Sequence, residues 1–242
     1  MIRTTLNLAI IIFALLSLQS KNVFADHYPK PSQRMVPLVL DCRSPGMIAL
    51  TFDDGPSDNF ETVLGTLKNH DVKATFFLLG SKLEKQHHID RALKAIEDGH
   101  QIENHSWDHE DFLKLSDAEI HTQVDNTNVI LWESLGVTPR FFRPPHGRID
   151  VPSAMPIWDL GYGVALWNLD PRDYDTAKSS QQVFQKIEDT LNNASPSEDS
   201  FVILLHDSTA TSIEKLDDII LTIKSHGYSI VTLDECADSG AH

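Results

Sequence analysis

Cysteine and positive charge are both scarce in this 242-residue chain. It has two cysteines, and its 20 Lys and Arg residues are outnumbered by 35 Asp and Glu residues, giving a formal net charge of −15. Proteins that bind nucleic acids or anionic membranes use basic surfaces, so both classes are disfavoured, whereas a neutral sugar polymer is compatible with this charge. Two isolated cysteines also lack the paired spacing of a structural zinc site. The ordinary apolar, Gly and Pro contents exclude fibrous and wholly disordered classes.

Long hydrophobic runs are absent except near the N-terminus. Arg3 precedes an apolar run over residues 6–18, and residues 23–25 (Val-Phe-Ala) place small side chains where a signal peptidase reads the chain. This pattern predicts a secretory signal peptide over residues 1–25, followed by a lead over 26–45. The run of about 13 residues is short for a bilayer span, and an uncleaved anchor is the alternative. We therefore expect an extracellular protein, or a periplasmic one in a Gram-negative cell.

Short β-type runs alternate with segments of helical spacing after residue 46. Alternation of this kind indicates parallel strands joined by helices, and seven units favour a closed (β/α) barrel, with an open doubly wound sheet as the alternative. We predict one α/β domain over residues 46–236 and a tail over 237–242. The predicted strands are 47–52, 74–79, 100–105, 140–143, 164–169, 201–206 and 228–233, and the predicted helices are 59–69, 82–98, 117–135, 181–193 and 211–226.

Helix boundaries are marked most clearly around one segment. Ser116 and Glu119 have the spacing of a capping box before the predicted 117–135 helix, and Gly136 stands where that helix is expected to end. Gly99 and Gly227 occupy the same place after two other helices.

The two cysteines lie near the two ends of the chain that follows the leader. In an exported protein Cys42 and Cys236 can persist as a disulfide, and a closed barrel brings its first and last strands together. We therefore predict a Cys42–Cys236 disulfide, with two free buried thiols as the alternative. On the chain-entropy model, closing a loop of about 190 residues adds roughly 5 kcal/mol, unless strain offsets it.

Polar residues gather directly after five of the predicted strands. Because ligands bind at the carboxyl ends of strands in parallel α/β folds, these five segments are expected to converge on one face. They are residues 51–56 (Thr-Phe-Asp-Asp-Gly-Pro), 105–109 (His-Ser-Trp-Asp-His), 143–147 (Arg-Pro-Pro-His-Gly), 170–174 (Asp-Pro-Arg-Asp-Tyr) and 204–206 (Leu-Leu-His).

The first two segments carry candidate metal ligands. Asp53 and Asp54 cannot both face inward on a straight strand, but a bend at residues 55–56 would bring both carboxylates to one pocket, one on a metal and one free as a base. The alternative is a solvated turn. His105 and His109 are four residues apart, a spacing that places two imidazoles on one side of a helical turn. The alternative is one structural and one surface histidine. Two His and one Asp form a ligand set of catalytic zinc sites, which leave positions open.

Two further strand ends carry candidate catalytic groups. Arg143 needs an anionic partner if it is buried, and a catalytic carboxylate is a natural one; the alternative is a surface guanidinium. His206 ends an apolar run and is either a core polar group or a catalytic acid, for which Asp173 could orient the ring and keep it protonated.

Together the five motifs, from about Pro45 to Leu233, resemble those of the polysaccharide deacetylases of carbohydrate esterase family 4, the NodB-homology group, and are most similar to its secreted chitin deacetylases. The resemblance implies a distorted (β/α) barrel that hydrolyses the acetamide of N-acetylglucosamine residues in chitin or chitooligosaccharides and releases acetate. It implies Zn²⁺ as cofactor, with Co²⁺ or another divalent ion able to substitute. The alternatives are a peptidoglycan N-acetylglucosamine deacetylase, an acetylxylan esterase and a non-catalytic sugar-binding relative.

The resemblance also implies a role for each motif residue. Asp53 resembles the general base, held by Arg143, and His206 the general acid, tuned by Asp173. Metal ligation falls to Asp54, His105 and His109, and substrate binding to Pro145, His146, Gly147, Tyr174 and Leu204, of which Leu204 receives the acetyl methyl.

Three positions depart from the family pattern. His146 replaces an aromatic residue whose backbone N–H helps to hold the oxyanion, and Tyr174 replaces a Trp. Glu103 replaces a small residue, and it either points away from the site or supplies a carboxylate behind it. We expect a monomer that acts on an N-acetylglucosamine polymer or oligomer, with no nucleic-acid partner and no membrane association after leader cleavage.

Overall fold

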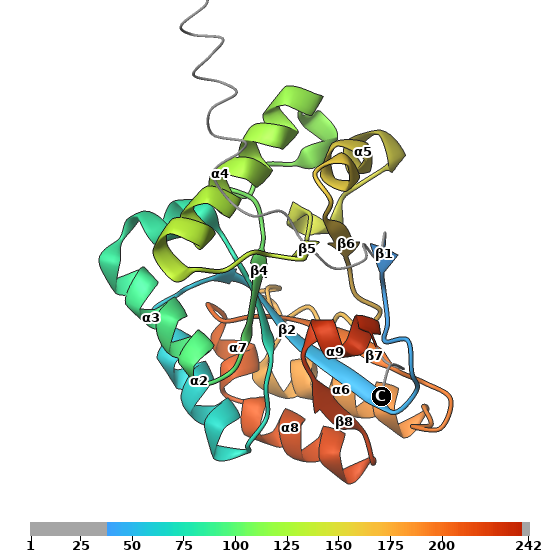
Figure 1. The fold of residues 1–242 in the computed structure, drawn as a ribbon. Coiled ribbons are helices and arrows are strands. Elements are labelled where there is room, and N and C mark those ends of the chain that lie inside the picture. The colour runs from blue at the N-terminus through green and yellow to red at the C-terminus, as the bar shows by residue number, and fades with distance from the viewer. Residues whose placement is uncertain (1–37, 239–242) are drawn as a thin grey trace, which may run out of the picture.

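The fold is built on parallel strands, and a computed structural model describes residues 38–238 (Figure 1). The predicted leader and residues 239–242 lie outside the described residues. The strands are β1 (Leu38–Val39), β2 (Met47–Gly55), β3 (Thr75–Leu78), β4 (Gln101–Asn104), β5 (Phe141–Phe142), β6 (Gly163–Ala165), β7 (Phe201–His206) and β8 (Ser229–Val231). The α-helices are α2 (Phe60–Asn69), α3 (Gln86–Glu97), α4 (Asp117–Leu135), α5 (Val151–Asp159), α6 (Ser180–Asn192), α7 (Ala210–Ile213), α8 (Leu216–Ser225) and α9 (Leu233–Asp238). Short 3-10 helices are η1 (Gly80–Glu84), η2 (Phe112–Lys114) and η3 (Pro145–Gly147).

The strands follow the order β1-β6-β5-β4-β3-β2-β7, and β8 pairs with the first residues of β2. All of these pairings are parallel. Within the described residues no ladder joins β1 to β7, but the chain that leaves β6 runs on to β7. There Leu169 donates its N–H to the Val202 carbonyl and accepts the Leu204 N–H. The sheet thus curls toward closure, and the predicted α/β fold with parallel strands is confirmed.

Two elements match their predicted ranges residue for residue, and two predicted helices are interrupted. β7 and α4 agree with prediction, and α4 has both the Ser116–Glu119 capping box and Gly136 in the left-handed conformation (φ 68°) that ends it. The predicted 82–98 helix is divided into η1 and α3 by Lys85, whose backbone is extended. The predicted 211–226 helix is divided into α7 and α8 by residues 214–215.

One strand and two α-helices were not predicted: β1, α5 and α9. β1 is two residues long and pairs only with β6 in the described sheet, so it leaves almost no pattern in the sequence. α5 contains Pro152 and Pro156, which discourage a helix prediction. Pro152 lies in the first turn, where its missing N–H costs nothing, and Pro156 removes a single internal hydrogen bond.

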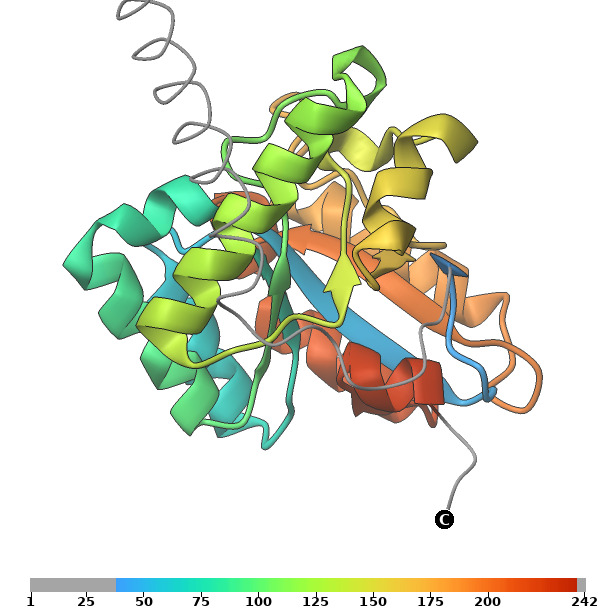
Figure 2. The same ribbon diagram turned by 45° about the horizontal axis from the view of Figure 1, so that its top comes forward.

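Helices cover the sheet as two groups. The larger core cluster joins β2, β3 and β7 to α2, α3, α6 and α8. A second cluster joins α4 and α5, which lie side by side in Figures 1 and 2, to the strands β5 and β6. A third cluster joins Ala49 of β2 and Val202 of β7 to Leu233 of α9, so both faces of β2 and β7 are buried, which accounts for their nearly continuous apolar sequence. Among residues 38–238, no helix has the length and apolarity to cross a bilayer.

α9 covers the amino ends of the central strands, opposite the strand ends that carry the polar motifs. Leu233 donates its N–H to Thr75 Oγ1 at the start of β3 (2.9 Å), and Asp234 donates to Gln101 Oε1 at the start of β4 (3.0 Å). The guanidinium of Arg140 also binds the Asp234 carboxylate, with 3.0 Å between Nη1 and Oδ1. In Figure 1, α9 lies across β2.

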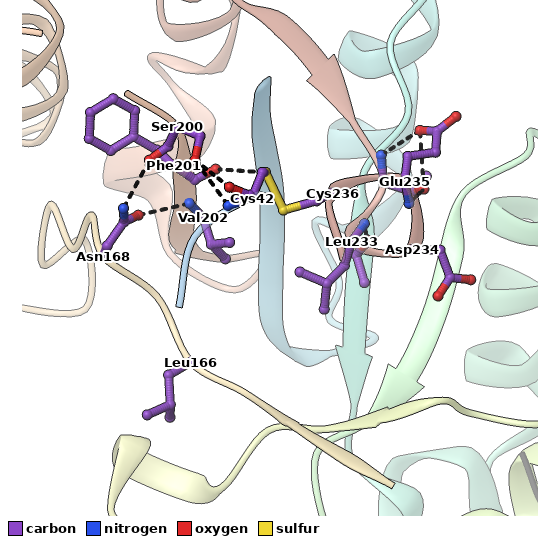
Figure 3. The surroundings of a disulfide bond; sticks show 12 residues. Cys42, Leu166, Asn168, Ser200, Phe201, Val202, Leu233, Asp234, Glu235 and Cys236 are labelled. Carbon is purple, nitrogen blue, oxygen red and sulfur yellow. Dashed lines mark hydrogen bonds between the residues drawn. A yellow bond between two sulfur atoms is a disulfide. The ribbon is translucent and has the colours of Figure 1, made fainter. Parts of the chain in front are cut away.

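The predicted disulfide is present between Cys42 and Cys236, 194 residues apart (Figure 3). Cys42 follows β1, and its backbone N–H and carbonyl both bind the Ser200 hydroxyl beside β7. Cys236 lies in α9, where its carbonyl accepts the Arg43 N–H (3.0 Å). The bond therefore fastens α9 to the segment that begins the sheet.

Candidate active site

A bulge at the end of β2 turns two adjacent carboxylates into one cavity. The register with β3 shifts between Asp53 and Gly55, and Asp54 has a left-handed backbone (φ 67°). An extra residue in a strand breaks the alternation of side chains, so Asp53 and Asp54 both line the cavity. The bend lies one residue before the predicted position at residues 55–56, and both carboxylates line one cavity as expected.

Asp54, His105 and His109 present ligand atoms that lie within 4.8 Å of one another. Asp54 Oδ1 is 3.3 Å from Nε2 of His105 and 3.3 Å from Nε2 of His109. That oxygen is buried and has no hydrogen-bond partner among the described residues. A buried carboxylate oxygen that faces two imidazole nitrogens fits a divalent cation, because a cation would supply the missing partner.

Both histidines are held ready to act as ligands. His105 donates from Nδ1 to the Arg143 carbonyl (2.8 Å), which leaves the lone pair on Nε2, facing Asp54. Burial and the nearby His105 imidazole lower the pKa of His109 to about 4, so the His109 side chain is neutral at neutral pH. Burial by itself would raise the pKa of Asp54, but the adjacent His105 imidazole, with His109 and His206, lowers it.

Arg143 is fully buried and binds Asp53. Its Nη1 donates to Asp53 Oδ1 and to Thr51 Oγ1, both at 2.7 Å, while Nη2 donates to the Leu166 carbonyl (3.0 Å). The guanidinium also lies over the ring of Phe77, 4.0 Å from its centre. Arg143 thus has the anionic partner expected of a buried arginine, and Asp53 keeps its second oxygen for the cavity.

His206 forms a pair with Asp173. Its Nδ1 donates to Asp173 Oδ1 (2.8 Å), and its backbone N–H donates to Asp173 Oδ2 (2.8 Å). Burial alone would lower the pKa of His206, but the hydrogen bond and charge of Asp173, helped by Asp53 and Asp54, raise it to about 9. At neutral pH the imidazole is therefore protonated, with Nε2 3.9 Å from Asp54 Oδ2.

The cavity has a volume of about 350 Å³ and a partly apolar wall. Of the predicted substrate-binding residues, His146, Tyr174 and Leu204 line it, whereas Pro145 and Gly147 do not. Trp167 lines it too and was missed, since a Trp inside a predicted strand carries no signal of the face it turns to. The complete lining is Asp53, Asp54, His105, His109, His146, Trp167, Tyr174, Leu204 and His206.

Gly147 supports this wall indirectly. It has φ 64°, and a Cβ there would lie 2.6 Å from the Trp167 ring. A larger residue would be strained and would displace Trp167. Pro145 is buried in the same turn, η3.

Left-handed backbone is concentrated around the cavity. Asp54, His109 and His146 all have positive φ and line it, and Ser106 has positive φ between the two histidine ligands. Such conformations are costly for non-glycine residues and persist where the surroundings fix them, typically at functional sites.

Comparison with known proteins identifies the family. Residues 41–165 match the family described as polysaccharide deacetylase. The chitin deacetylase of Colletotrichum lindemuthianum is 32% identical over 214 residues, which cover 85% of this chain and 86% of that protein. The chain belongs to the polysaccharide deacetylase family.

Other members differ in length and in activity. The solved structure of the C. lindemuthianum enzyme superposes with a TM-score of 0.80 at 31% identity, over 85% of this chain and 94% of that one. The peptidoglycan-N-acetylglucosamine deacetylase PgdA of Listeria monocytogenes is 36% identical over 206 residues, 85% of this chain but 42% of PgdA. BA3943 of Bacillus anthracis, described as a CE4 family pseudoenzyme, has a TM-score of 0.74 at 25% identity, over 84% of this chain and 70% of that one. The polysaccharide deacetylase fold alone therefore does not decide catalysis.

The three departures from the family pattern are placed as follows. His146 packs edge-on against His109, with 4.5 Å between ring centres, and Tyr174 packs edge-on against His206 (5.5 Å) while its hydroxyl donates to Asp170 (2.9 Å). Glu103 points away from the cavity: its Oε2 accepts the N–H groups of Arg140 and Phe141 (2.9 and 2.7 Å). Burial raises the pKa of Glu103.

Proposed function

We propose that this protein is a secreted, metal-dependent N-deacetylase that hydrolyses the acetamide of N-acetylglucosamine residues in chitin or chitooligosaccharides. The observation that carries the proposal is the convergence, in one cavity, of a carboxylate held by Arg143, a three-residue donor set and a protonated histidine. These are the parts that metal-assisted amide hydrolysis requires.

We assign Zn²⁺ to Asp54, His105 and His109, with Co²⁺ able to replace it. One carboxylate and two imidazoles are a donor set of catalytic zinc sites, and three protein ligands leave room for water and substrate. The ion would polarise the amide carbonyl and make a water molecule more acidic.

The proton path follows from the contacts of this chain's residues. Asp53 accepts a proton from the attacking water at Oδ2, since Arg143 occupies Oδ1 and keeps the carboxylate oriented. His206 donates its Nε2 proton to the departing amine, because Asp173 holds Nδ1. The backbone N–H of His146 donates to the developing oxyanion. Leu204 receives the acetyl methyl, and Trp167 and Tyr174 complete the wall.

Export is part of the proposal. The predicted leader over residues 1–25 supports it, as does the Cys42–Cys236 disulfide, a type of bond that persists in oxidising compartments. N-terminal sequencing of protein recovered outside the cytoplasm tests it, with Asp26 as the expected first residue.

Peptidoglycan is the second candidate substrate, favoured by the 36% identity to PgdA. Chitin is preferred here because the match to the C. lindemuthianum chitin deacetylase covers 85% of this chain and 86% of that protein. The deciding experiment measures acetate release from chitin oligomers, peptidoglycan and acetylated xylan side by side, with metal-free and zinc-loaded protein. Chitin oligomers should be the best substrate, and zinc should be required. Faster release from peptidoglycan would reassign the substrate.

A non-catalytic sugar-binding role is the alternative from another class, and one of the structural relatives with this fold is described as a pseudoenzyme. The presence of Asp53, Arg143 and His206 around one cavity argues against it. Binding of all three polymers without acetate release by zinc-loaded protein would favour it.

A further inference from the structure

Two charged residues that do not line the cavity, Lys82 and Asp207, bind the bulged end of β2 and the turn that follows it. Asp54 has positive φ, and such a conformation persists only when the surroundings fix it. We propose that Lys82 and Asp207 are the positioning residues that fix the turn over residues 53–57, and so set the direction of both active-site carboxylates. This inference rests on the proposed function of the site.

Lys82 holds the carbonyl of Asp54 and ties it to the histidine ligands. Its ammonium lies 2.5 Å from that carbonyl oxygen. Lys82 belongs to η1, whose first residues bind the loop that carries His105 and His109: Gly80 donates its N–H to the Ser106 carbonyl (3.0 Å), and Ser81 donates to the Trp107 carbonyl (2.9 Å). One short element therefore holds the carboxylate ligand and the histidine loop in register.

Asp207 holds the other end of the turn. Its Oδ2 accepts the Ser57 N–H (2.7 Å), and its backbone carbonyl accepts the Ser57 hydroxyl (2.8 Å). The same carboxylate packs against Gly55, where a Cβ would lie 3.0 Å from Oδ2. Because Asp207 directly follows His206, these contacts also link the turn to the strand that carries the proposed acid.

The two residues are placed to act through others. The nine residues that line the cavity include neither of them. Asp207 is fully buried, so its contacts with Ser57 are sheltered from water. Charge-assisted hydrogen bonds are stronger than neutral ones, and groups that orient metal ligands typically contribute 10- to 100-fold in affinity or rate.

The test measures zinc affinity of the full-length, metal-depleted protein by competition with a chromogenic chelator, together with kcat and KM on a chitin oligomer. Lys82→Met should weaken zinc binding by about tenfold and lower kcat, with little change in KM. Lys82→Arg keeps a charged donor and should restore most of both. Lys73→Met is the matched control, because Lys73 also donates to a backbone carbonyl, that of Asp98 (2.6 Å), but away from the cavity.

Asp207 is tested by a pair of substitutions of similar size. Asp207→Leu removes the acceptor and should weaken zinc binding, whereas Asp207→Asn keeps an oxygen for the Ser57 N–H and should have a smaller effect. If Asp207→Leu does not fold, Lys82→Met decides the question.

Three results would overturn the proposal: unchanged zinc affinity in Lys82→Met, an equal loss in Lys73→Met, or tighter zinc binding in Lys82→Met. The last would show that the ammonium acts only by repelling the ion. If the wild type releases no acetate from any substrate, the proposed function fails, but the zinc affinities still test the positioning role.

Discussion

Adjacent aspartates of identical chemistry have different partners in this site. Asp53 binds the buried guanidinium of Arg143, whereas Asp54 faces His105 and His109 with an oxygen that lacks a hydrogen bond in the described structure. Arg143 holds one oxygen of Asp53 and leaves the other free to accept a proton, whereas a carboxylate with an open buried oxygen is suited to a cation. The local backbone, and not residue type, thus separates the two proposed roles.

The first prediction follows from that separation. Asp53→Asn should retain zinc and lose activity by at least about 100-fold, the usual contribution of a general base. Asp54→Asn should lose zinc, as should His105→Ala and His109→Ala, because each removes a ligand atom. Metal content by elemental analysis and acetate release are measured on the same samples. Zinc loss in Asp53→Asn with zinc retained in Asp54→Asn would reverse the two assignments.

The second prediction concerns His206 and pH. The raised pKa of about 9 means that the imidazole is charged through neutral pH and loses its proton as the pH approaches 9. If this proton is the one donated, its loss should shape the alkaline limb of kcat/KM. Asp173→Asn removes the largest charge that favours the imidazolium, so the alkaline limb should move to lower pH.

His206→Ala provides the matching control. It should lower the rate by about 100-fold or more while zinc content stays the same. A rate close to wild type would make His206 a core polar residue. An unmoved alkaline limb in Asp173→Asn would reject the coupling of this pair, and would assign the limb to another group at the metal site.

For individual residues, the sequence predicted which active-site side chains meet in the cavity, but not which other residues hold them in position. Strand-end motifs are local, so the convergence of Asp53, His105 and His206 could be predicted from parallel topology alone. Lys82 and Asp207 act through contacts between residues 28 and 150 positions apart, and single side chains carry no local signal of such contacts. Trp167 was missed for the same reason.

Among the elements, those with marked ends were predicted best. α4 has a capping box before it and a left-handed glycine after it, and its range was predicted without error. η1 and α3 were joined in the prediction because the apolar spacing continues through Lys85, although the backbone there is extended to place Lys82 on the β2 turn. Tertiary contacts outweigh local periodicity at that point.

The third prediction belongs to the start of β4. His100 Nδ1 accepts the Ala74 N–H (3.1 Å), and Nε2 is buried with no partner among the described residues. Burial and the nearby Lys73 lower the pKa of His100 to about 4, below the ordinary value near 6.5. The neutral form is favoured by folding, so the associated stability is present above pH 6.5 and is lost as the pH falls toward 4.

Urea unfolding at pH 7.5 and pH 5, with chelator present, measures this loss. Between these pH values His100 should lower the free energy of unfolding by about 2 kcal/mol. His100→Asn keeps an acceptor for the Ala74 N–H and cannot gain the proton. Between the two pH values, its free energy of unfolding should therefore fall by about 2 kcal/mol less than that of the wild type. Equal losses in the two proteins would show that His100 is not neutralised by folding.

Across the whole molecule, the site and the disulfide lie at opposite ends of the strands. The cavity is at the carboxyl ends, while α9 and Cys236 cover the amino ends of β3 and β4. The disulfide was predictable because the chain has two cysteines and a curled sheet brings distant segments together. The attachment of the disulfide through α9 could not be predicted, because a helix of six residues leaves too short a pattern in the sequence.

The last prediction is that removing the disulfide lowers stability without changing the distant active site. A bond that closes a loop of 194 residues restricts the unfolded chain, and the chain-entropy model gives about 5 kcal/mol of stability. The double variant Cys42→Ser/Cys236→Ser should therefore melt roughly 10–20 °C lower, at about 2–4 °C per kcal/mol for a chain of this size. Its kcat and zinc content, measured well below the transition, should match the wild type, because neither sulfur lies near the cavity.

Reductant should lower the wild-type Tm to that of the double variant and leave the variant unchanged. A double variant with the wild-type Tm would show that the bond adds nothing, and one with normal Tm but lost zinc would show that the two ends of the molecule are coupled.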